Sequence, residues 1–233
     1  MSETLIIPGE TIPVSETSEI VLGPNVVVSP VDNQSIIPTT NGFLNIKEKK
    51  GSTLYYVESN TKRYIPHVND FVIGTIVGVF GEFYRVSLAN FSAPAILSQY
   101  AFPNATKKNR PHLNIGDIVY ARVSCADREL DVEIECIDPT TGKDGGFGVL
   151  EGGYLFDVKL GYARYLLFNE SSELFNKLVT KAKFEIAIGV NGKVWIKTDD
   201  IKSTIACSRS IKEAQNWVKE DISKNVDVIF KTV

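Results

Sequence analysis

Apolar and polar positions alternate over short stretches in the first part of this 233-residue chain, and no helical period appears there. The apolar runs 5–7, 26–28, 42–46 and 53–57 are separated by turn-forming residues, and four of the ten prolines lie before position 31. Short runs bounded by Pro, Gly and Asn are typical of β strands. We therefore predict a small N-terminal β domain over residues 1–64.

The middle of the chain has the clearest strand pattern. The run from Phe71 to Phe80 is apolar almost throughout and contains two glycines, as expected of a strongly bent strand. Apolar and polar residues then alternate over 82–88, 118–123 and 130–136. Four or five strands within about 70 residues predict an OB-type five-stranded barrel over residues 65–147, a fold whose strands and loops commonly bind oligonucleotides.

The last segment, residues 148–233, changes period. Apolar residues at three- and four-residue spacing predict helices over 158–168 and 171–180, and an Asn-Gly pair predicts a hairpin between strands 184–188 and 193–197. The mixture predicts an α+β domain, so the whole chain is mixed but rich in β structure.

Two further elements are predicted near the C-terminus. Ser210-Ile-Lys-Glu213 has the form of a capping box and predicts the start of a helix there. Ile211, Ala214, Val218 and Ile222 would lie on one face of that helix. Residues 226–230 are predicted as a last strand.

Charge is distributed unevenly along the chain. The formal net charge of −3 argues against a nucleic-acid-binding protein when taken alone. However, residues 60–125 carry seven basic and three acidic residues. Residues 1–59 carry three basic and seven acidic residues, and residues 126–150 carry two basic and seven acidic residues. The basic block coincides with the predicted barrel, which indicates one basic face on an otherwise acidic protein.

Cysteines and histidines are too few and too scattered for the usual metal and catalytic sites. Cys125, Cys136 and Cys207 form no CxxC pair, and His67 and His112 lie beside prolines with no partner at ligand spacing. We therefore predict no catalytic residues, no metal and no cofactor, with free thiols that suit a reducing compartment. The N-terminus lacks the basic start of a signal peptide, and the longest apolar run, 71–81, is too short to cross a bilayer. These features predict a soluble intracellular protein.

Candidate RNA-binding residues cluster in and around the predicted barrel. Aromatic side chains beside cations suit single-stranded RNA, because bases stack on the rings while phosphates meet the cations. The candidates are Lys62, Arg63, Phe83, Arg85, Lys107, Lys108, Arg110, Tyr120 and Arg122. For Phe83 and Tyr120, packing against a neighbouring domain or subunit is the alternative.

Four long motifs resemble one family over essentially the whole chain. They are RYIPHVNDFVIGTIVGVF (63–80), AFPNATKKNRPHLNIGDIVYARV (101–123), GFGVLEGG (146–153) and FEIAIGVNGKVWIK (184–197), with IIPGETIPV (6–14) at the start. They are similar to the S1/KH cap subunits of the eukaryotic RNA exosome. The resemblance is closer to one of the two S1/KH members, and the other stays an alternative. A cap subunit with a zinc ribbon is excluded because CxxC pairs are missing.

The resemblance implies an N-terminal β domain, an S1 barrel and a KH domain in a non-catalytic subunit. Its implied partners are single-stranded RNA, a ring of ribonuclease-PH-like subunits and other exosome subunits, with no membrane and no DNA. The implied role is to stabilise the ring and to guide RNA to 3′→5′ nucleases in ribosomal RNA processing and mRNA turnover. The implied location is the nucleus, nucleolus and cytoplasm. A purely structural clamp without RNA contact is the competing hypothesis.

One motif of the family needs a separate interpretation. A standard KH domain grips RNA with a GxxG loop between two helices. Here the similar GxNG sequence, Gly189, Val190, Asn191 and Gly192, falls between two predicted strands with Lys193 as its adjacent cation. Since Asn-Gly is explained by the needs of a tight turn, we predict a structural role for this motif and RNA contact on the barrel.

Overall fold

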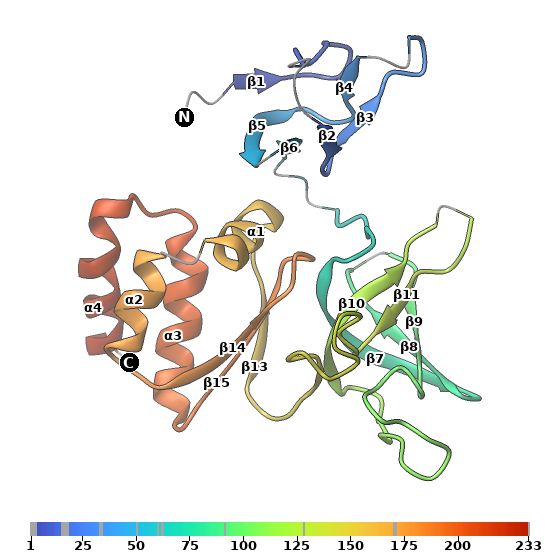
Figure 1. Ribbon diagram of the computed structural model, residues 1–233. Helices are drawn as coiled ribbons and strands as arrows, with labels where there is room; N and C mark the ends of the chain where they lie inside the picture. The colour runs from blue at the N-terminus through green and yellow to red at the C-terminus, as the bar shows by residue number, and fades with distance from the viewer. Residues whose placement is uncertain are drawn as a thin grey trace. The chain divides into compact units, whose positions relative to one another are not determined.

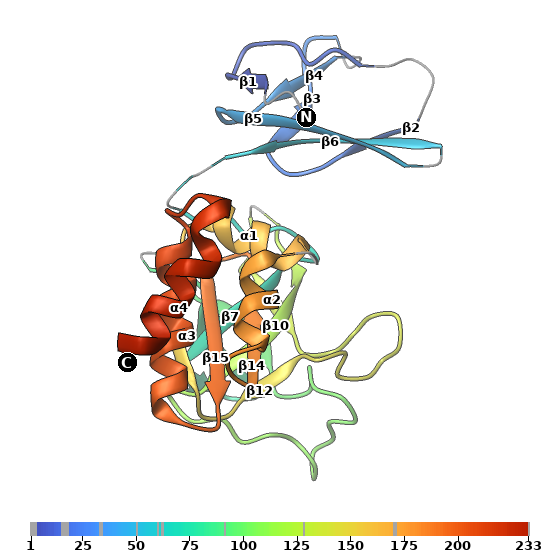
Figure 2. The same ribbon diagram turned by 90° about the vertical axis from the view of Figure 1, so that its left-hand side faces the viewer.

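The computed structural model divides the chain into two compact units, Met1–Thr61 and Lys62–Val233, which are described separately (Figures 1 and 2). It describes residues 4–14, 19–32, 35–49, 51–59, 61, 63–90, 92–127, 129–169 and 172–232. Within these ranges, no helix combines the length and the apolar character needed to cross a membrane.

The N-terminal unit is built from short strands. Its four-stranded sheet has the order β1-β5-β6-β2. A second pair joins β3 to β4. The strands are β1 (Thr4–Ile6), β2 (Glu19–Leu22), β3 (Val26–Val28), β4 (Ile36–Pro38), β5 (Gly42–Lys49) and β6 (Ser52–Glu58). Ile12, Ile36, Tyr55 and Val57 are almost fully buried, so this unit has a small core of its own.

The second unit begins with a closed five-stranded barrel, as the alternating sequence predicts. Its strands are β7 (Phe71–Phe80), β8 (Phe83–Ser87), β9 (Ala95–Ser98), β10 (Ile118–Cys125) and β11 (Glu133–Glu135). β7 pairs with β8 and β10, and β9 pairs with β8 and β11. The pairing of β11 with β10 closes the barrel. A short strand, β12 (Gly148–Leu150), extends the sheet beside β10.

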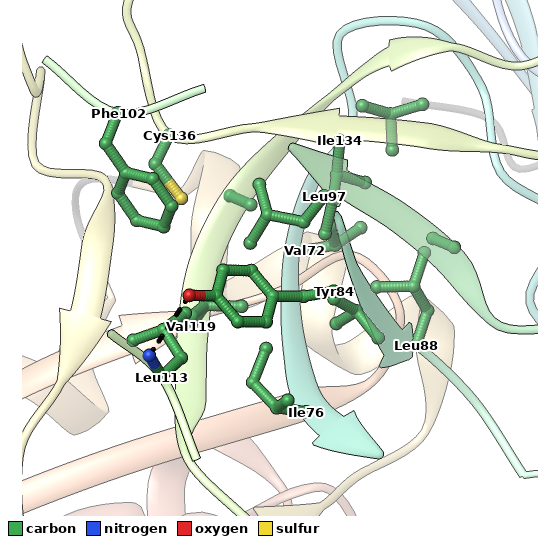
Figure 3. Packing of buried hydrophobic residues seen from close by; sticks show 14 of the residues in the cluster. Val72, Ile76, Tyr84, Leu88, Leu97, Phe102, Leu113, Val119, Ile134 and Cys136 are labelled. Atoms are coloured by element: carbon green, nitrogen blue, oxygen red, sulfur yellow. Dashed lines mark hydrogen bonds between the residues drawn. The ribbon is translucent and has the colours of Figure 1, made fainter. Parts of the chain in front are cut away.

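The barrel core consists of the inward residues of these strands. Val72, Leu97 and Val119 are fully buried, and Tyr84 is 1% exposed (Figure 3). The tyrosine ring lies among aliphatic side chains while its hydroxyl reaches the edge of the core, where it meets Leu113 (Figure 3). Burial of this apolar set is the main source of the barrel's stability.

The C-terminal domain packs four helices on one face of a three-stranded sheet of order β13-β15-β14. The elements are β13 (Tyr154–Asp157), α1 (Leu160–Phe168), α2 (Glu173–Val179), β14 (Phe184–Ile188), β15 (Lys193–Thr198), α3 (Ile201–Ala214), the 3-10 helix η1 (Lys219–Asp221) and α4 (Ile222–Thr232). Figure 1 shows the sheet between the helices and the barrel. On the barrel side, Ala187 and Trp195 contact Ile73 of β7, so the two domains share a second, smaller core.

The two predictions near the C-terminus are wrong. α3 begins nine residues before Ser210, because the Asp200 carboxylate caps it by accepting a hydrogen bond from the Ser203 backbone N–H at 2.7 Å. Ser210 is buried in the middle of that helix. Residues 226–230 belong to α4, where Val226 and Ile229 are buried at helical spacing. Packing of this face against α2 and α3 overrides the local strand preference of the sequence.

Candidate nucleic-acid interface

An exposed aromatic pair lies at the tip of the β7–β8 hairpin. Phe80 and Phe83 are cross-strand partners, and their rings stack with centroids 5.6 Å apart and an interplanar angle of 27°. The guanidinium carbon of Arg85 lies 5.0 Å from the centroid of the Phe80 ring. Because Tyr84 and Val86 face the core, strand alternation places Phe83 and Arg85 outside. About two fifths of each Phe remains exposed, so both rings are accessible to a base.

A basic loop connects β9 to β10 and carries Lys107, Lys108 and Arg110. The two lysines are exposed, and the backbone amides of Thr106 and Asn109 bond to each other's carbonyls across the turn that holds them. The Tyr84 hydroxyl anchors the loop from inside the barrel. It donates to the Pro111 carbonyl at 2.8 Å and accepts from the Leu113 backbone N–H at 3.2 Å.

The hairpin and the loop meet at Glu82. Its Oε1 accepts a hydrogen bond from the Tyr100 hydroxyl at 2.7 Å and lies 3.7 Å from Nη1 of Arg110. Its backbone carbonyl accepts from the Gln99 N–H at 2.9 Å. We call the joined region the hairpin–loop surface. It consists of Phe80, Glu82, Phe83, Arg85, Tyr100, Lys107, Lys108 and Arg110. With four cations, one carboxylate and two stacked rings, it has the composition of a single-stranded nucleic-acid site.

Arg63 lies away from the hairpin–loop surface. The neighbouring Tyr64 hydroxyl donates to Asp70 at 2.7 Å, at the start of β7, whereas Phe80 ends the same strand. A ten-residue strand extends about 30 Å, so Arg63 lies near the other end of the barrel. Lys62 lies outside the described residues.

Two predicted RNA-binding residues, Tyr120 and Arg122, are partly buried within the second unit, and for Tyr120 this is the packing against a neighbouring domain that the sequence left open. The Tyr120 hydroxyl donates to the Ile188 carbonyl at 3.3 Å, and burial raises its pKa to about 12. Arg122 pairs with Glu135 and Asn69, and its side chain is 11% exposed. Strand alternation identifies the outward face of β10 but not the domain and the neighbouring strand that cover it.

The GxNG motif lies in the contact between the barrel and the C-terminal domain. Asn191 is 6% exposed. Its Oδ1 accepts from the Ile73 N–H at 3.2 Å, and its Nδ2 donates to the carbonyls of Ile73 at 2.8 Å and Leu88 at 2.6 Å. A side chain at Gly189 would place Cβ 2.8 Å from the Ile73 nitrogen, and Gly192 has a φ of +81°. The three residues that the GxNG pattern specifies, Gly189, Asn191 and Gly192, are therefore explained by the tight turn or by its contact with β7.

Sequence reasoning misses three members of the hairpin–loop surface, Phe80, Glu82 and Tyr100. A signal for Phe80 is present, because Phe80-Gly-Glu-Phe83 reads as two strands joined by a two-residue turn. The convergence of Glu82 with Tyr100 and Arg110 has no local signal, since it depends on the path of the loop.

Comparison with known proteins gives matches to three family models. They are the S1 domain of exosome complex component RRP40 over residues 64–148, a KH domain over 153–202, and the "Exosome complex exonuclease Rrp40 N-terminal domain" over 20–63. The Saccharomyces cerevisiae "Exosome complex component RRP40" is 51% identical over 232 residues, covering 99% of this chain and 93% of the relative. The chain belongs to the RRP40 family.

More distant relatives are consistent with this assignment. The "Exosome complex component rrp40" of Schizosaccharomyces pombe is 39% identical, covering 96% of this chain and 93% of the relative. The "Exosome complex component Rrp4" of Ignisphaera aggregans is 24% identical, covering 91% of this chain and 83% of the relative. The higher identity to RRP40 proteins favours that family over the other S1/KH cap subunit.

Proposed function

We propose that this RRP40-family chain is a cap subunit of an RNA exosome, that it binds single-stranded RNA on the hairpin–loop surface, and that it does not cleave RNA itself. Family membership supports the place in the complex. The observation that carries the RNA site is the exposed Phe80–Phe83 stack, which lies on the same surface as Lys107, Lys108 and Arg110.

The surface would bind RNA through two kinds of contact. Phe80 and Phe83 offer exposed faces for bases, and base–aromatic stacking tolerates any sequence because every base has a π face. Lys107 and Lys108 are exposed cations for the backbone phosphates. Such a surface would hold a passing strand without strong sequence preference, as suits a subunit that guides RNA.

The remaining parts of the proposal concern partners and location. The ribonuclease-PH-like ring subunits are the expected protein partners, and 3′→5′ cleavage belongs to other subunits of the assembly. Ribosomal RNA processing and mRNA turnover, in the nucleus, nucleolus and cytoplasm, are the expected setting. If the purified full chain degraded RNA and lost that activity on substitution of an Asp or Glu, the non-catalytic assignment would be wrong.

The RNA site is tested by charge reversal in the full chain. Lys107→Glu/Lys108→Glu should weaken binding to a labelled oligoribonucleotide at least tenfold at low salt. It should also reduce the slope of log K against log salt by about 1.4, which is about 0.7 per lost phosphate contact. Lys202→Glu/Lys224→Glu is the matched control, because it reverses two exposed lysines on α3 and α4. Equal effects of the two double variants would contradict a local RNA site.

A structural clamp without RNA contact is the second candidate function. It is favoured by the N-terminal sheet, where Leu5, Val21 and Phe43 are 63%, 42% and 45% exposed. These residues share one face in the strand register, and apolar area of this kind suits a protein partner. Crosslinking of RNA to the assembled complex separates the two functions, because a pure clamp would give no crosslink to this subunit.

A further inference from the structure

Glu82 is the single carboxylate within the hairpin–loop surface, and one of its oxygens has two partners. Oε1 accepts from the Tyr100 hydroxyl at 2.7 Å and faces Nη1 of Arg110 at 3.7 Å. Gly81 and Glu82 form the turn between Phe80 and Phe83, so Glu82 is the chain neighbour of one of the two stacked rings. A hydroxyl donor and a guanidinium that converge on one anionic oxygen form a typical donor set for a phosphate.

The contact between Glu82 and Arg110 is weak in the free protein. Its 3.7 Å separation exceeds the length of a hydrogen bond, and the Glu82 side chain is 55% exposed. Exposed ion pairs of this kind contribute little to stability. Tyr100 is also partly exposed, and its hydrogen bond to Glu82 raises the pKa of the phenol, which therefore stays a donor at neutral pH.

We propose that Tyr100 and Arg110 form a phosphate-binding position that the Glu82 carboxylate occupies in the free protein and that an RNA phosphate takes on binding. The proposal rests on the proposed function, since it assigns one phosphate contact within the same RNA site. Glu82 then lowers RNA affinity for two reasons. The phosphate must displace the Glu82 carboxylate, and the bound phosphate still lies near the negative charge of Glu82.

The test is a double-mutant cycle in the full chain. A labelled oligouridylate is titrated at several salt concentrations with the wild type, Glu82→Gln, Arg110→Gln and the double variant. Glu82→Gln should bind about three- to fivefold more tightly at low salt, with a salt slope steeper by about 0.7, because no carboxylate then offsets the Arg110 charge at the bound phosphate. Arg110→Gln should weaken RNA binding less than about twofold when it is introduced into the wild type. In the Glu82→Gln protein, the same substitution should remove the whole gain in RNA affinity.

Two further variants make the result specific. Glu220→Gln removes an exposed carboxylate from η1 and controls for the change in net charge, so it should leave affinity unchanged. Glu82→Ala should give the same gain as Glu82→Gln, so the result does not depend on how one substitution affects folding.

Each outcome decides the proposal. An unchanged affinity of both Glu82 variants, or a gain that persists without Arg110, overturns the phosphate position. If Lys107→Glu/Lys108→Glu still weakens binding in that case, the RNA site stands and only the role of Glu82 is wrong. If neither the lysine pair nor Glu82 affects RNA binding, the proposed RNA surface itself is wrong.

Discussion

Substitution of Asn191 should destabilise the second unit, because this side chain joins its two domains. Asn191 belongs to the C-terminal domain, but its side chain bonds to the backbone of two barrel segments, at Ile73 and at Leu88. Asn191→Ala removes the three hydrogen bonds that link the domains at this point.

The expected cost follows from those three bonds. A hydrogen bond contributes about 1 kcal/mol net, so Asn191→Ala should lower the free energy of unfolding by about 3 kcal/mol. Asn191→Asp should cost more than Asn191→Ala, because it replaces the amide donor with an oxygen that faces two carbonyl oxygens at 2.6–2.8 Å. Both changes also weaken the contact that holds the two domains of this unit together.

Tryptophan fluorescence provides the assay. The two tryptophans of the chain, Trp195 and Trp217, both lie in the second unit, and Trp195 is 4% exposed in the contact between the domains. Urea unfolding followed at these residues therefore reports the stability of this unit alone. The wild type should unfold in one transition. Asn191→Asp should unfold at a lower urea concentration or in two separate transitions.

An exposed asparagine on α2 supplies the control. Asn176→Ala removes no bond between the domains and should change the free energy of unfolding by less than about 0.5 kcal/mol. If Asn191→Ala were as stable as Asn176→Ala, the interpretation of the GxNG motif as a contact between domains would be refuted.

Three further predictions concern the barrel. Arg122→Gln should lower the free energy of unfolding by about 2 kcal/mol or more, because it leaves the Glu135 carboxylate unpaired, and the RNA affinity of the folded protein should not change. Tyr84→Phe should cost about 1–3 kcal/mol and should speed hydrogen exchange at the Leu113 amide, which loses its acceptor. Burial raises the pKa of the Cys136 thiol to about 12 from 9.0, so the native state holds this proton more tightly than the unfolded chain does. The stability that the thiol contributes to the native state is therefore fully present below pH 9 and is lost as the pH rises from 9 toward 12. Urea unfolding should show that Cys136→Ala loses about 1.4 kcal/mol less between pH 8 and pH 10 than the wild type does, and an unchanged pH dependence would contradict the burial of this thiol.

Much of the barrel could be predicted because its strands are indicated by the alternation of residues that are close together in the sequence. The alternation around Tyr84 and Val86 identifies the buried face of β8, and the structure confirms it. The same alternation places Phe83 and Arg85 outside, and these residues remain exposed. The error at residues 226–230 arises from the same source, since Val226 and Ile229 suit a strand or a helix until the packing of α4 is known.

The remaining features depend on residues far apart in the sequence. Ile73 and Asn191 are separated by 118 residues, so the role of the GxNG motif in joining two domains has no local signal. Tyr120 and Arg122 are outward-facing by pattern, but the first is covered by the C-terminal domain and the second by Glu135. The pairing of Glu82 with Arg110 likewise depends on the path of a loop that the sequence does not specify.

The central claim is that RNA contacts this subunit at the hairpin–loop surface rather than at the GxNG motif. Photo-crosslinking of a single-stranded RNA to the assembled complex, followed by identification of the crosslinked peptides, tests it most directly. We expect crosslinks in the segments that contain Phe83 and Lys107, and their loss in Lys107→Glu/Lys108→Glu. Crosslinks confined to residues 189–192, or none on this subunit, would contradict the account.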